Sequence, residues 1–170
     1  MNTIHISRFW FLLICLFLAI LPLTSTASII RLQTVLGVID IQLYDEAAPK
    51  TVENFYIYLN NNAYNRSIFH RSMPGFIIQG GGYVWNQTTN EDNPIVKLPP
   101  VVNEFSADRS NVRGTIAMAK LPDKPNSATS EWFINLADNS ANLNKQNDGF
   151  TVFGQVIGNG MQVADAIASL

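Results

Sequence analysis

The chain has 170 residues, of which 47% are hydrophobic, and its formal net charge at pH 7 is −2. This length allows one domain with a substantial core, and a mildly acidic chain without basic runs is a poor candidate for binding nucleic acid. No internal repeat, linker or low-complexity tract divides the sequence.

The first 27 residues have the layout of a secretory signal peptide. A short start is followed by an apolar run at 9–21, which is 13 residues long and therefore shorter than the ~20 residues of a membrane-spanning helix. Small residues at Ser25 and Ala27 predict cleavage after Ala27, so we expect residues 28–170 to form the mature domain, without stable insertion in a membrane. A retained N-terminal anchor is the alternative.

Removal of this segment would change the chemistry available to the mature chain. Cys15 and His5 would leave with it, so the domain would hold no cysteine and one histidine, His70. Disulfides, thiol catalysis and a zinc site of cysteine and histidine would then be excluded. Loss of Arg8 would move the formal charge from −2 to −3. A domain without cysteine needs no oxidative folding, which fits an exported protein of the bacterial periplasm.

The domain begins with a predicted β-hairpin and a predicted helix. Residues 29–44 alternate around Gly37, which predicts two strands. Residues 48–64 predict a helix, because Pro49 suits its first turn and apolar residues follow at helical spacing. The expected core positions are Ile30, Leu32, Val38 and Ile41 in the hairpin and Val52, Phe55 and Leu59 in the helix.

Short strands, polar loops and a closing helix are predicted for the rest of the chain. The expected strands are 66–71, 75–81, 101–105, 113–119, 131–137 and 150–157. The expected loops are 81–100, 120–130 and 138–149. The closing helix, 160–170, is expected to turn Met161, Val163, Ala164 and Ile167 inward. One mainly β domain with two helices follows, and closure into a barrel would avoid exposed sheet edges.

Residues 69–82 read FHRSMPGFIIQGGG and place Arg71 and Gln79 among apolar residues. A guanidinium is costly to bury without a partner, so this apolar surface must need a fixed cluster of N–H donors. The pattern F-H-R-x-x-P-G-F-x-x-Q-G-G resembles that of the cyclophilin family of peptidyl-prolyl isomerases. The segments 114–136 and 142–167 resemble two further blocks of the same family, in the same order.

The resemblance implies an antiparallel barrel of eight strands capped by two helices, with the active site on the outer surface of the barrel. In the family a final strand follows the closing helix, so the last strand of this barrel can be missing at the C-terminus. The short loop with SATS, residues 127–130, is most similar to bacterial exported members. We therefore expect an isomerase that acts on X–Pro bonds of unfolded or extended exported proteins, assists their folding as a chaperone would, and needs no metal or cofactor.

The chemistry assigns catalysis to Arg71. Rotation about the prolyl amide crosses a barrier of ~18–20 kcal/mol, because the C–N bond has partial double-bond character. The twisted amide has a free lone pair on nitrogen, and a donor directed at that lone pair stabilises the twisted state alone. A guanidinium is permanently charged and rich in donors. Gln79 is the second catalytic residue, since it can orient Arg71 and bind the substrate backbone.

The proline ring needs an apolar slot, which the resemblance supplies. The backbone of Ala119 and Lys120 is expected to pair with the peptide as an added strand does. The implied substrate-binding residues are Phe76, Ile77, Met118, Ala119, Lys120, Phe133, Leu143 and Phe150.

Several of these residues have structural alternatives. Arg71 could instead pair with Glu104 or Asp108. His70 is interpreted as a structural, hydrogen-bonded residue, because no serine, cysteine or metal partner is indicated for it. A non-catalytic chaperone or binding module for proline-containing segments would use the same pocket, and it is the alternative function.

Four positions depart from the family pattern. Asn142 stands where well-known members carry tryptophan, which argues against strong cyclosporin binding. Phe150 replaces a histidine, Glu131 a glutamine and Lys120 an asparagine. We expect these changes to alter the preference for the residue before proline.

Overall fold

The computed structural model describes residues 27–170. Apart from Ala27, the predicted signal peptide lies outside the described residues. The elements in chain order are β1 (Ile29–Thr34), β2 (Gly37–Leu43), α1 (Pro49–Asn60), β3 (Arg71–Met73), β4 (Ile77–Gly80), β5 (Tyr83–Asn86), β6 (Glu91–Pro94), β7 (Thr115–Met118), β8 (Trp132–Asn135), α2 (Ser140–Leu143), the 3-10 helix η1 (Gln146–Asp148), β9 (Val152–Ile157) and α3 (Gly160–Ala168).

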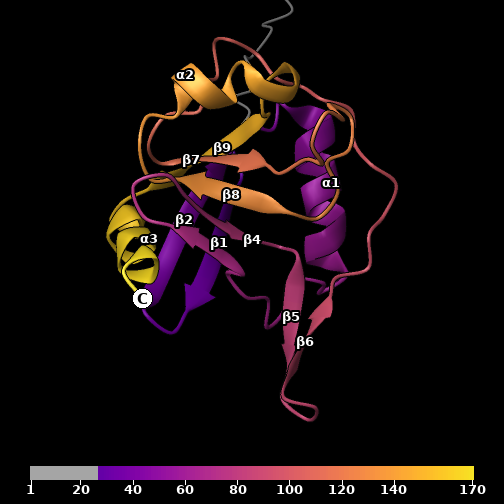
Figure 1. Ribbon diagram of the computed structural model, residues 1–170, viewed down its shortest axis with the longest axis vertical. Coiled ribbons are helices and arrows are strands. Elements are labelled where there is room, and N and C mark those ends of the chain that lie inside the picture. Colours follow the sequence, from indigo (N-terminus) through magenta and orange to yellow (C-terminus); the bar gives the residue numbers. More distant parts are fainter. Residues whose placement is uncertain (1–26) are drawn as a thin grey trace, which may run out of the picture.

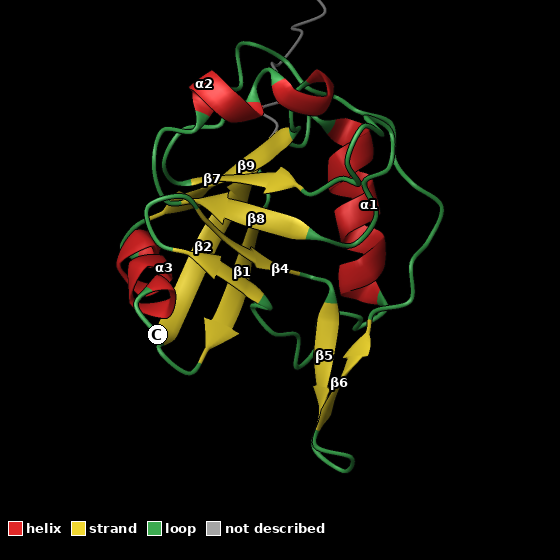
Figure 2. Ribbon diagram, in the orientation of Figure 1, coloured by secondary structure: helices red, strands yellow, loops and turns green. Residues whose placement is uncertain are grey.

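Seven of the strands form one antiparallel sheet in the order β1-β2-β9-β7-β8-β4-β3. The sheet curls into a half-barrel, with α1 beside one end and α3 beside the other (Figures 1 and 2). Within the described residues β1 and β3 are its edges. The predicted fold class, mainly β and cyclophilin-like, is confirmed, although the curled sheet stays open where an eight-stranded barrel would close.

The hairpin of β1 and β2 forms as predicted, with one error in its core. Ile39, Ile41 and Leu43 are fully buried, because side chains two apart share one face of a strand. Val38 lies on the opposite face and is 45% exposed, so its predicted core position is wrong. Gly37 ends the turn with φ of +135°, a conformation that favours glycine.

Helix α1 begins at Pro49 and buries Val52 and Phe55, as the spacing predicts. Its first backbone N–H groups are satisfied from a distant part of the chain. The Glu104 carboxylate accepts hydrogen bonds from the backbone N–H of Lys50 (3.2 Å) and of Thr51 (2.8 Å). A carboxylate at a helix N-terminus is favourable, because orphan N–H groups and the positive end of the helix dipole lie there. Glu104 is therefore engaged away from Arg71.

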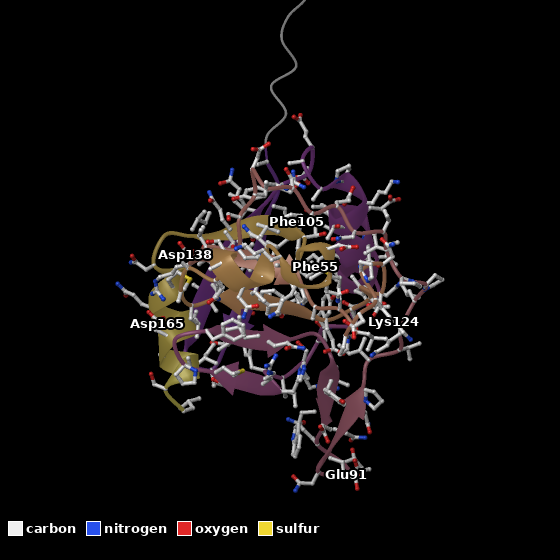
Figure 3. The ribbon with its side chains drawn as sticks, turned by 45° about the horizontal axis from the view of Figure 1, so that its top comes forward. Phe55, Glu91, Phe105, Lys124, Asp138 and Asp165 are labelled. Atoms are coloured by element: carbon white, nitrogen blue, oxygen red, sulfur yellow. The ribbon has the colours of Figure 1, made fainter. Side chains whose placement is uncertain are left out.

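The expected loop at 81–100 contains a hairpin, β5 and β6. It extends from one end of the molecule (Figure 1), and Figure 3 shows Glu91 far from Phe55 in the interior. The turn is held by the Asn86 side chain, which accepts from the backbone N–H of Thr88 at 2.9 Å. Because this ribbon is largely solvent-exposed, its residues need no apolar alternation, and the periodicity gave no signal for it.

Two further predictions about local structure are wrong. The expected strand at 101–105 is reduced to a single bridge between Val101 and Ala128. The expected loop at 138–149 contains α2 and η1. Helices of three or four residues are too short to show a helical period in the sequence.

The strands β7, β8 and β9 bury side chains on both faces of the sheet. Ile116, Ile134 and Phe153 face the larger cluster, which also contains α1 and α3. Their neighbours in sequence face a smaller cluster on the opposite side, and this cluster is Ile77, Ala117, Phe133, Leu143 and Val152, with Phe76, Ala119 and Phe150 at its margin. The outer surface of the half-barrel thus carries an apolar patch of its own, and the candidate site lies there.

Candidate active site

The outer apolar cluster opens into a cavity of about 170 Å³. The residues that line it come from β3, β4, β8, α2 and the loops after β7 and before β9. They are Arg71, Phe76, Ile77, Gln79, Ala119, Lys120, Phe133, Leu143 and Phe150. These are nine of the ten residues that were predicted for the site. Met118 does not line the cavity; it is 1% exposed and packs in the larger cluster, because it alternates with Ala117 along β7.

The floor of the cavity is apolar and rigidly packed. Ile77, Phe133 and Leu143 are all buried, and the rings of Phe133 and Phe150 meet edge to face with centroids 5.7 Å apart. Phe76 joins them although strict alternation would separate it from Gln79. It lies in the turn before β4, where its N–H donates to the Met73 carbonyl, so strand alternation does not apply to it. The result is a slot that suits a small apolar ring.

Arg71 lies at the rim of this slot, on the edge strand β3 directly opposite Gln79 on β4. Its Nη1 donates to Gln79 Oε1 at 3.3 Å, and its Nη2 donates to Met73 Sδ at 2.9 Å. Among residues 27–170 no carboxylate forms an ion pair with it. The structural alternative, pairing with Glu104 or Asp108, is therefore not what the structure shows.

Gln79 connects Arg71 to a second polar group, Glu131. Gln79 Nε2 donates to Glu131 Oε2 at 2.9 Å. Lys97 Nζ lies 3.4 Å from the other carboxylate oxygen, and His70 Nε2 lies 3.5 Å from Oε2. The His70 ring also packs against Tyr83, with centroids 5.1 Å apart.

Tight packing explains the glycines that follow Gln79. A Cβ atom at Gly80 would lie 3.1 Å from Trp132 Cη2, and one at Gly81 would lie 2.8 Å from Trp132 Nε1. Gly81 also has φ of +76°, which L side chains rarely adopt. The backbone beside the site therefore lies directly on the buried indole of Trp132.

Lys120 fixes the far wall of the cavity. Its Nζ donates to the carbonyls of Asn147 and Gly149, each at 2.6 Å, and lies 4.9 Å from the centre of the Phe150 ring. Desolvation by burial lowers the pKa of Lys120 to about 8, against a smaller opposing effect of Asp148. The side chain thus ties the loop that carries Phe150 to the end of β7.

The backbone of Lys120, just after β7, has groups that can pair with a peptide. The Ala119 N–H already donates to the Glu131 carbonyl at 2.9 Å, so it cannot pair with a substrate as predicted. Among the described residues no hydrogen bond uses the backbone N–H or carbonyl of Lys120. Those two groups can accept an added strand.

A buried network of asparagines supports the walls of the cavity, and no sequence pattern predicts it. Asn139 donates to the Phe76 carbonyl at 2.9 Å and to Asn135 Oδ1 at 2.8 Å. Asn111 donates to the Phe150 carbonyl at 3.0 Å. Isolated asparagines in loops usually indicate turns, and only the fold reveals that these side chains converge.

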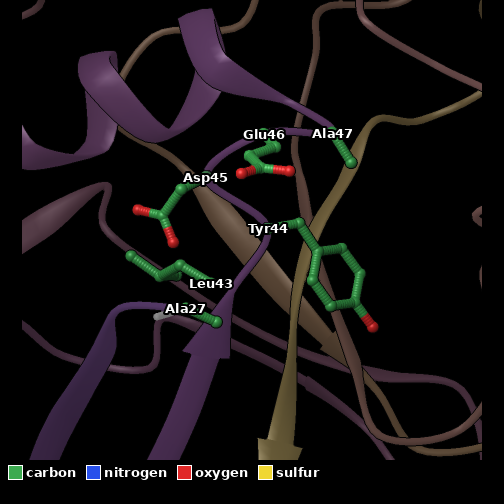
Figure 4. Close-up of a pocket in the computed structure, with 6 residues that line it drawn as sticks. All are labelled: Ala27, Leu43, Tyr44, Asp45, Glu46 and Ala47. Carbon is green, nitrogen blue, oxygen red and sulfur yellow. The ribbon is translucent and has the colours of Figure 1, made fainter. Parts of the chain in front are cut away.

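A second hollow, of about 200 Å³, lies elsewhere, where β2 ends (Figure 4). It is lined by Ala27, Leu43, Tyr44, Asp45, Glu46 and Ala47. No cationic donor lines it, and part of its wall is Ala27. Beside it the backbone N–H of Ser28 donates to Asp45 Oδ2 at 2.9 Å. Although it is the larger hollow, it lacks the chemistry that the predicted reaction needs.

Within residues 27–170 no group of three or more histidine, cysteine, aspartate or glutamate side chains is placed to hold a metal ion. In the same part of the chain no helix has both the length and the apolar character needed to cross a membrane.

The curled antiparallel sheet and the apolar slot on its outer surface, with an arginine at the rim that has no carboxylate partner among residues 27–170, define a protein of the cyclophilin-like fold class. The family model described as "Cyclophilin type peptidyl-prolyl cis-trans isomerase/CLD" matches residues 29–170. The chain belongs to this family.

Individual relatives agree with the family match. A peptidyl-prolyl cis-trans isomerase of Acinetobacter baylyi is 44% identical over 144 residues, which are 84% of this chain and 73% of that protein. Peptidyl-prolyl cis-trans isomerase A of Dickeya dadantii is 44% identical over 147 residues, 86% of this chain and 74% of that protein. A cyclophilin-type isomerase of Cryptosporidium parvum, solved in the presence of the dipeptide Ala-Pro, is 25% identical with a TM-score of 0.67, covering 83% of this chain and 85% of that one.

Proposed function

We propose that this protein is a peptidyl-prolyl cis-trans isomerase whose reaction takes place in the slot beside Arg71. The family match and the names of the bacterial relatives support the activity. The observation that carries the assignment of the site is the guanidinium of Arg71, which lies at the rim of an apolar cavity with no carboxylate partner among residues 27–170.

In the proposed mechanism the proline ring enters the slot over Phe133, Ile77 and Leu143. Fixing the ring leaves the acyl side of the X–Pro bond free to rotate. As the amide twists, its nitrogen gains a lone pair, and an N–H of Arg71 donates to it. This interaction is absent in the planar cis and trans forms, so it lowers the barrier without favouring either product. No bond forms or breaks, and no proton is transferred.

The substrate backbone would be held beside the slot. The free N–H and carbonyl of Lys120 can pair with an extended peptide in the manner of an added strand. Such pairing needs an unfolded or extended segment, because a folded strand has already used its backbone groups. Phe150 and Lys120 line the far wall and would contact the residue before proline.

We further propose that the protein acts on exported polypeptides in the bacterial periplasm. The signal-like first 27 residues and the absence of cysteine from the rest of the chain support this location. The relatives named above from Acinetobacter and Dickeya are bacterial. Prolyl isomerisation is slow enough to limit folding, so an isomerase there would accelerate the folding of its clients.

The test is an isomerisation assay on an X–Pro tetrapeptide with the wild type and with Arg71→Ala. We expect Arg71→Ala to lose on the order of 100-fold in kcat/KM, equivalent to roughly 3 kcal/mol of barrier lowering. The matched control is Arg31→Ala, because Arg31 is an exposed arginine on the other sheet edge that pairs with Asp40 at 2.6 Å. A wild type with no rate above background, yet with affinity for the peptide, would show the alternative, a non-catalytic module that binds proline-containing segments.

A further inference from the structure

Glu131 lies behind the catalytic pair and does not line the cavity. It immediately precedes β8, and its side chain is 24% exposed. One carboxylate oxygen accepts from Gln79 Nε2 at 2.9 Å, and the other lies 3.4 Å from Lys97 Nζ. The other end of the Gln79 amide is its Oε1 atom, which accepts from Arg71 Nη1 at 3.3 Å. Within the described residues the hydrogen-bonded path from Glu131 to Arg71 therefore runs through Gln79.

A carboxylate at this position restricts how the Gln79 amide can lie. An amide has an acceptor at one end and a donor at the other, whereas an ionised carboxylate can only accept. Glu131 can thus bind the nitrogen end of the amide alone, which leaves the oxygen end facing Arg71. The reversed amide would place two oxygens against each other at Glu131 and two sets of donors against each other at Arg71. Both contacts would be repulsive.

We infer that Glu131 is a positioning residue that holds Gln79 with its oxygen toward Arg71 and so fixes the guanidinium over the cavity. The inference rests on the proposed function of Arg71. The family usually has a glutamine at this position, and a glutamine can accept or donate. This chain has an acceptor-only group in its place, so the orientation of Gln79 no longer depends on how a second amide lies.

The charge of Glu131 could affect the reaction without Gln79, and the variants must separate the two effects. Glu131→Gln removes the charge but keeps a carbonyl that can accept from Gln79. Glu131→Met removes both the charge and the acceptor at nearly the same length. Lys97→Met is the matched control, since Lys97 contacts the same carboxylate from the opposite side and its side chain is 52% exposed.

The first experiment measures kcat/KM on an X–Pro tetrapeptide, with thermal unfolding to show that each variant is folded. We expect Glu131→Met to lose about tenfold, the effect of removing one hydrogen bond to a charged group, and Glu131→Gln to lose about two- to threefold. Lys97→Met should change the rate less than twofold, as is typical of exposed ion pairs. Equal losses in Glu131→Gln and Glu131→Met would show that only the charge matters and would overturn the inference.

The second experiment asks whether Glu131 acts through Gln79. In a Gln79→Ala background the Glu131→Met change should have less than a twofold further effect, because effects that pass through a shared partner are not additive. An unchanged tenfold loss in that background would overturn the inference, and so would a folded Glu131→Met protein with wild-type activity.

A nuclear magnetic resonance measurement separates this inference from the proposed function. The side-chain NH₂ resonances of Gln79 should shift in Glu131→Met and stay in place in Lys97→Met, whether or not the protein is active. An inactive wild type, or an unaffected Arg71→Ala, would refute the function while this measurement still tests the contact. Unmoved Gln79 resonances in Glu131→Met would refute the contact itself, and with it the inference.

Discussion

At the scale of single residues, the site depends on groups whose identity carries a physical requirement. In the proposed mechanism Arg71 supplies a permanent charge, Gln79 orients Arg71, and Glu131 orients Gln79 through the hydrogen bonds between them. Lys120 has a different role, because its ammonium group donates hydrogen bonds to two backbone carbonyls of the chain itself. Its side chain therefore shapes the wall of the slot while its backbone remains free for a peptide.

The lowered pKa of Lys120 predicts how stability depends on pH. The pKa is about 8 in the folded protein and 10.5 is the ordinary value, so the unfolded chain binds more protons between these values. The free energy of unfolding should then rise with pH across that window. Lys120→Met lacks this titration, so the difference in stability between wild type and variant should rise between pH 8 and 10.5. Chemical denaturation at several pH values measures it, and a flat or falling difference would contradict the prediction.

Gly81 predicts a strong effect of a very small change. In Gly81→Ala the new methyl group would overlap the Ser130 carbonyl and lie 2.8 Å from Trp132 Nε1, in a conformation with φ of +76°. We expect a loss of about 2 kcal/mol or more in the free energy of unfolding, since strain and steric overlap add. The control is Gly75→Ala, which also has positive φ but has no atom within 4 Å of the new Cβ. Urea denaturation should show the smaller loss for that control.

The residues of the slot were predicted from the resemblance to the cyclophilin family, whose motifs recur in this chain in the same order, and nine of the ten predicted site residues line one cavity. Met118 was misassigned, since the motif shows which residues are near the site but not which face of β7 each occupies. The role of Glu131 was not predicted either. Glu131 and Gln79 are 52 residues apart in sequence, and only the pairing of β4 with β8 shows that they meet.

At the scale of elements, the upper walls of the cavity on the outer face of β7, β8 and β9 are not strands, so the sheet's own hydrogen bonds do not hold them. Loops form the upper walls of the cavity, and a buried set of asparagines ties those loops to the sheet. Asn135, on β8, is at the centre of this set. It donates to Thr115 Oγ1 at 2.9 Å and accepts from Asn139 at 2.8 Å.

Asn135→Ala should weaken both the fold and the slot. The change leaves buried partners without a hydrogen bond, which costs about 1–3 kcal/mol for each unsatisfied group. Because Asn139 also holds the Phe76 carbonyl, we expect a higher KM together with the lower stability. Asn93→Ala, on the exposed strand β6, is the control and should change neither quantity. Normal stability and normal KM in Asn135→Ala would contradict this account of the network.

The elements that were missed have a common cause. Periodicity detects an element only when one of its faces is buried over several residues. The ribbon of β5 and β6 is mostly exposed, and α2 has only four residues, so neither produced a pattern. Each of the elements that were predicted correctly buries a continuous face. These elements are the hairpin of β1 and β2 and the helices α1 and α3.

At the scale of the whole molecule, one sheet serves two purposes. Its inner face packs with α1 and α3 as the core, and its outer face carries the apolar slot. The class of fold was predictable because the order of strands and helices is encoded along the chain. The open edges at β1 and β3 follow from the pairing of strands, which local sequence does not reveal.

Removal of the first 27 residues should strengthen the hydrogen bond between Ser28 and Asp45 at the start of the domain. If the exported chain begins at Ser28, the nitrogen that now donates to Asp45 becomes a charged α-ammonium group. Hydrogen bonds between charged groups are stronger than neutral ones. Asp45→Asn should therefore destabilise the processed chain, which begins at Ser28, by about 1 kcal/mol more than it destabilises the unprocessed chain. Thermal unfolding of both forms measures this difference. Equal effects of Asp45→Asn in the two forms would contradict the prediction, and Asp92→Asn on the exposed hairpin is the control.

The packing of glycine backbone on Trp132 has a practical consequence for optical studies of this protein. From Ser28 onward the chain has two tryptophans, and they report on different surroundings: Trp132 is 3% exposed in the larger core cluster, whereas Trp85 is 38% exposed on the hairpin. Trp132 should emit at shorter wavelength, and Trp85 should be quenched first by dissolved iodide. With Trp85→Phe in this chain, the remaining fluorescence would report on the unfolding of the larger core cluster, where Trp132 lies, alone.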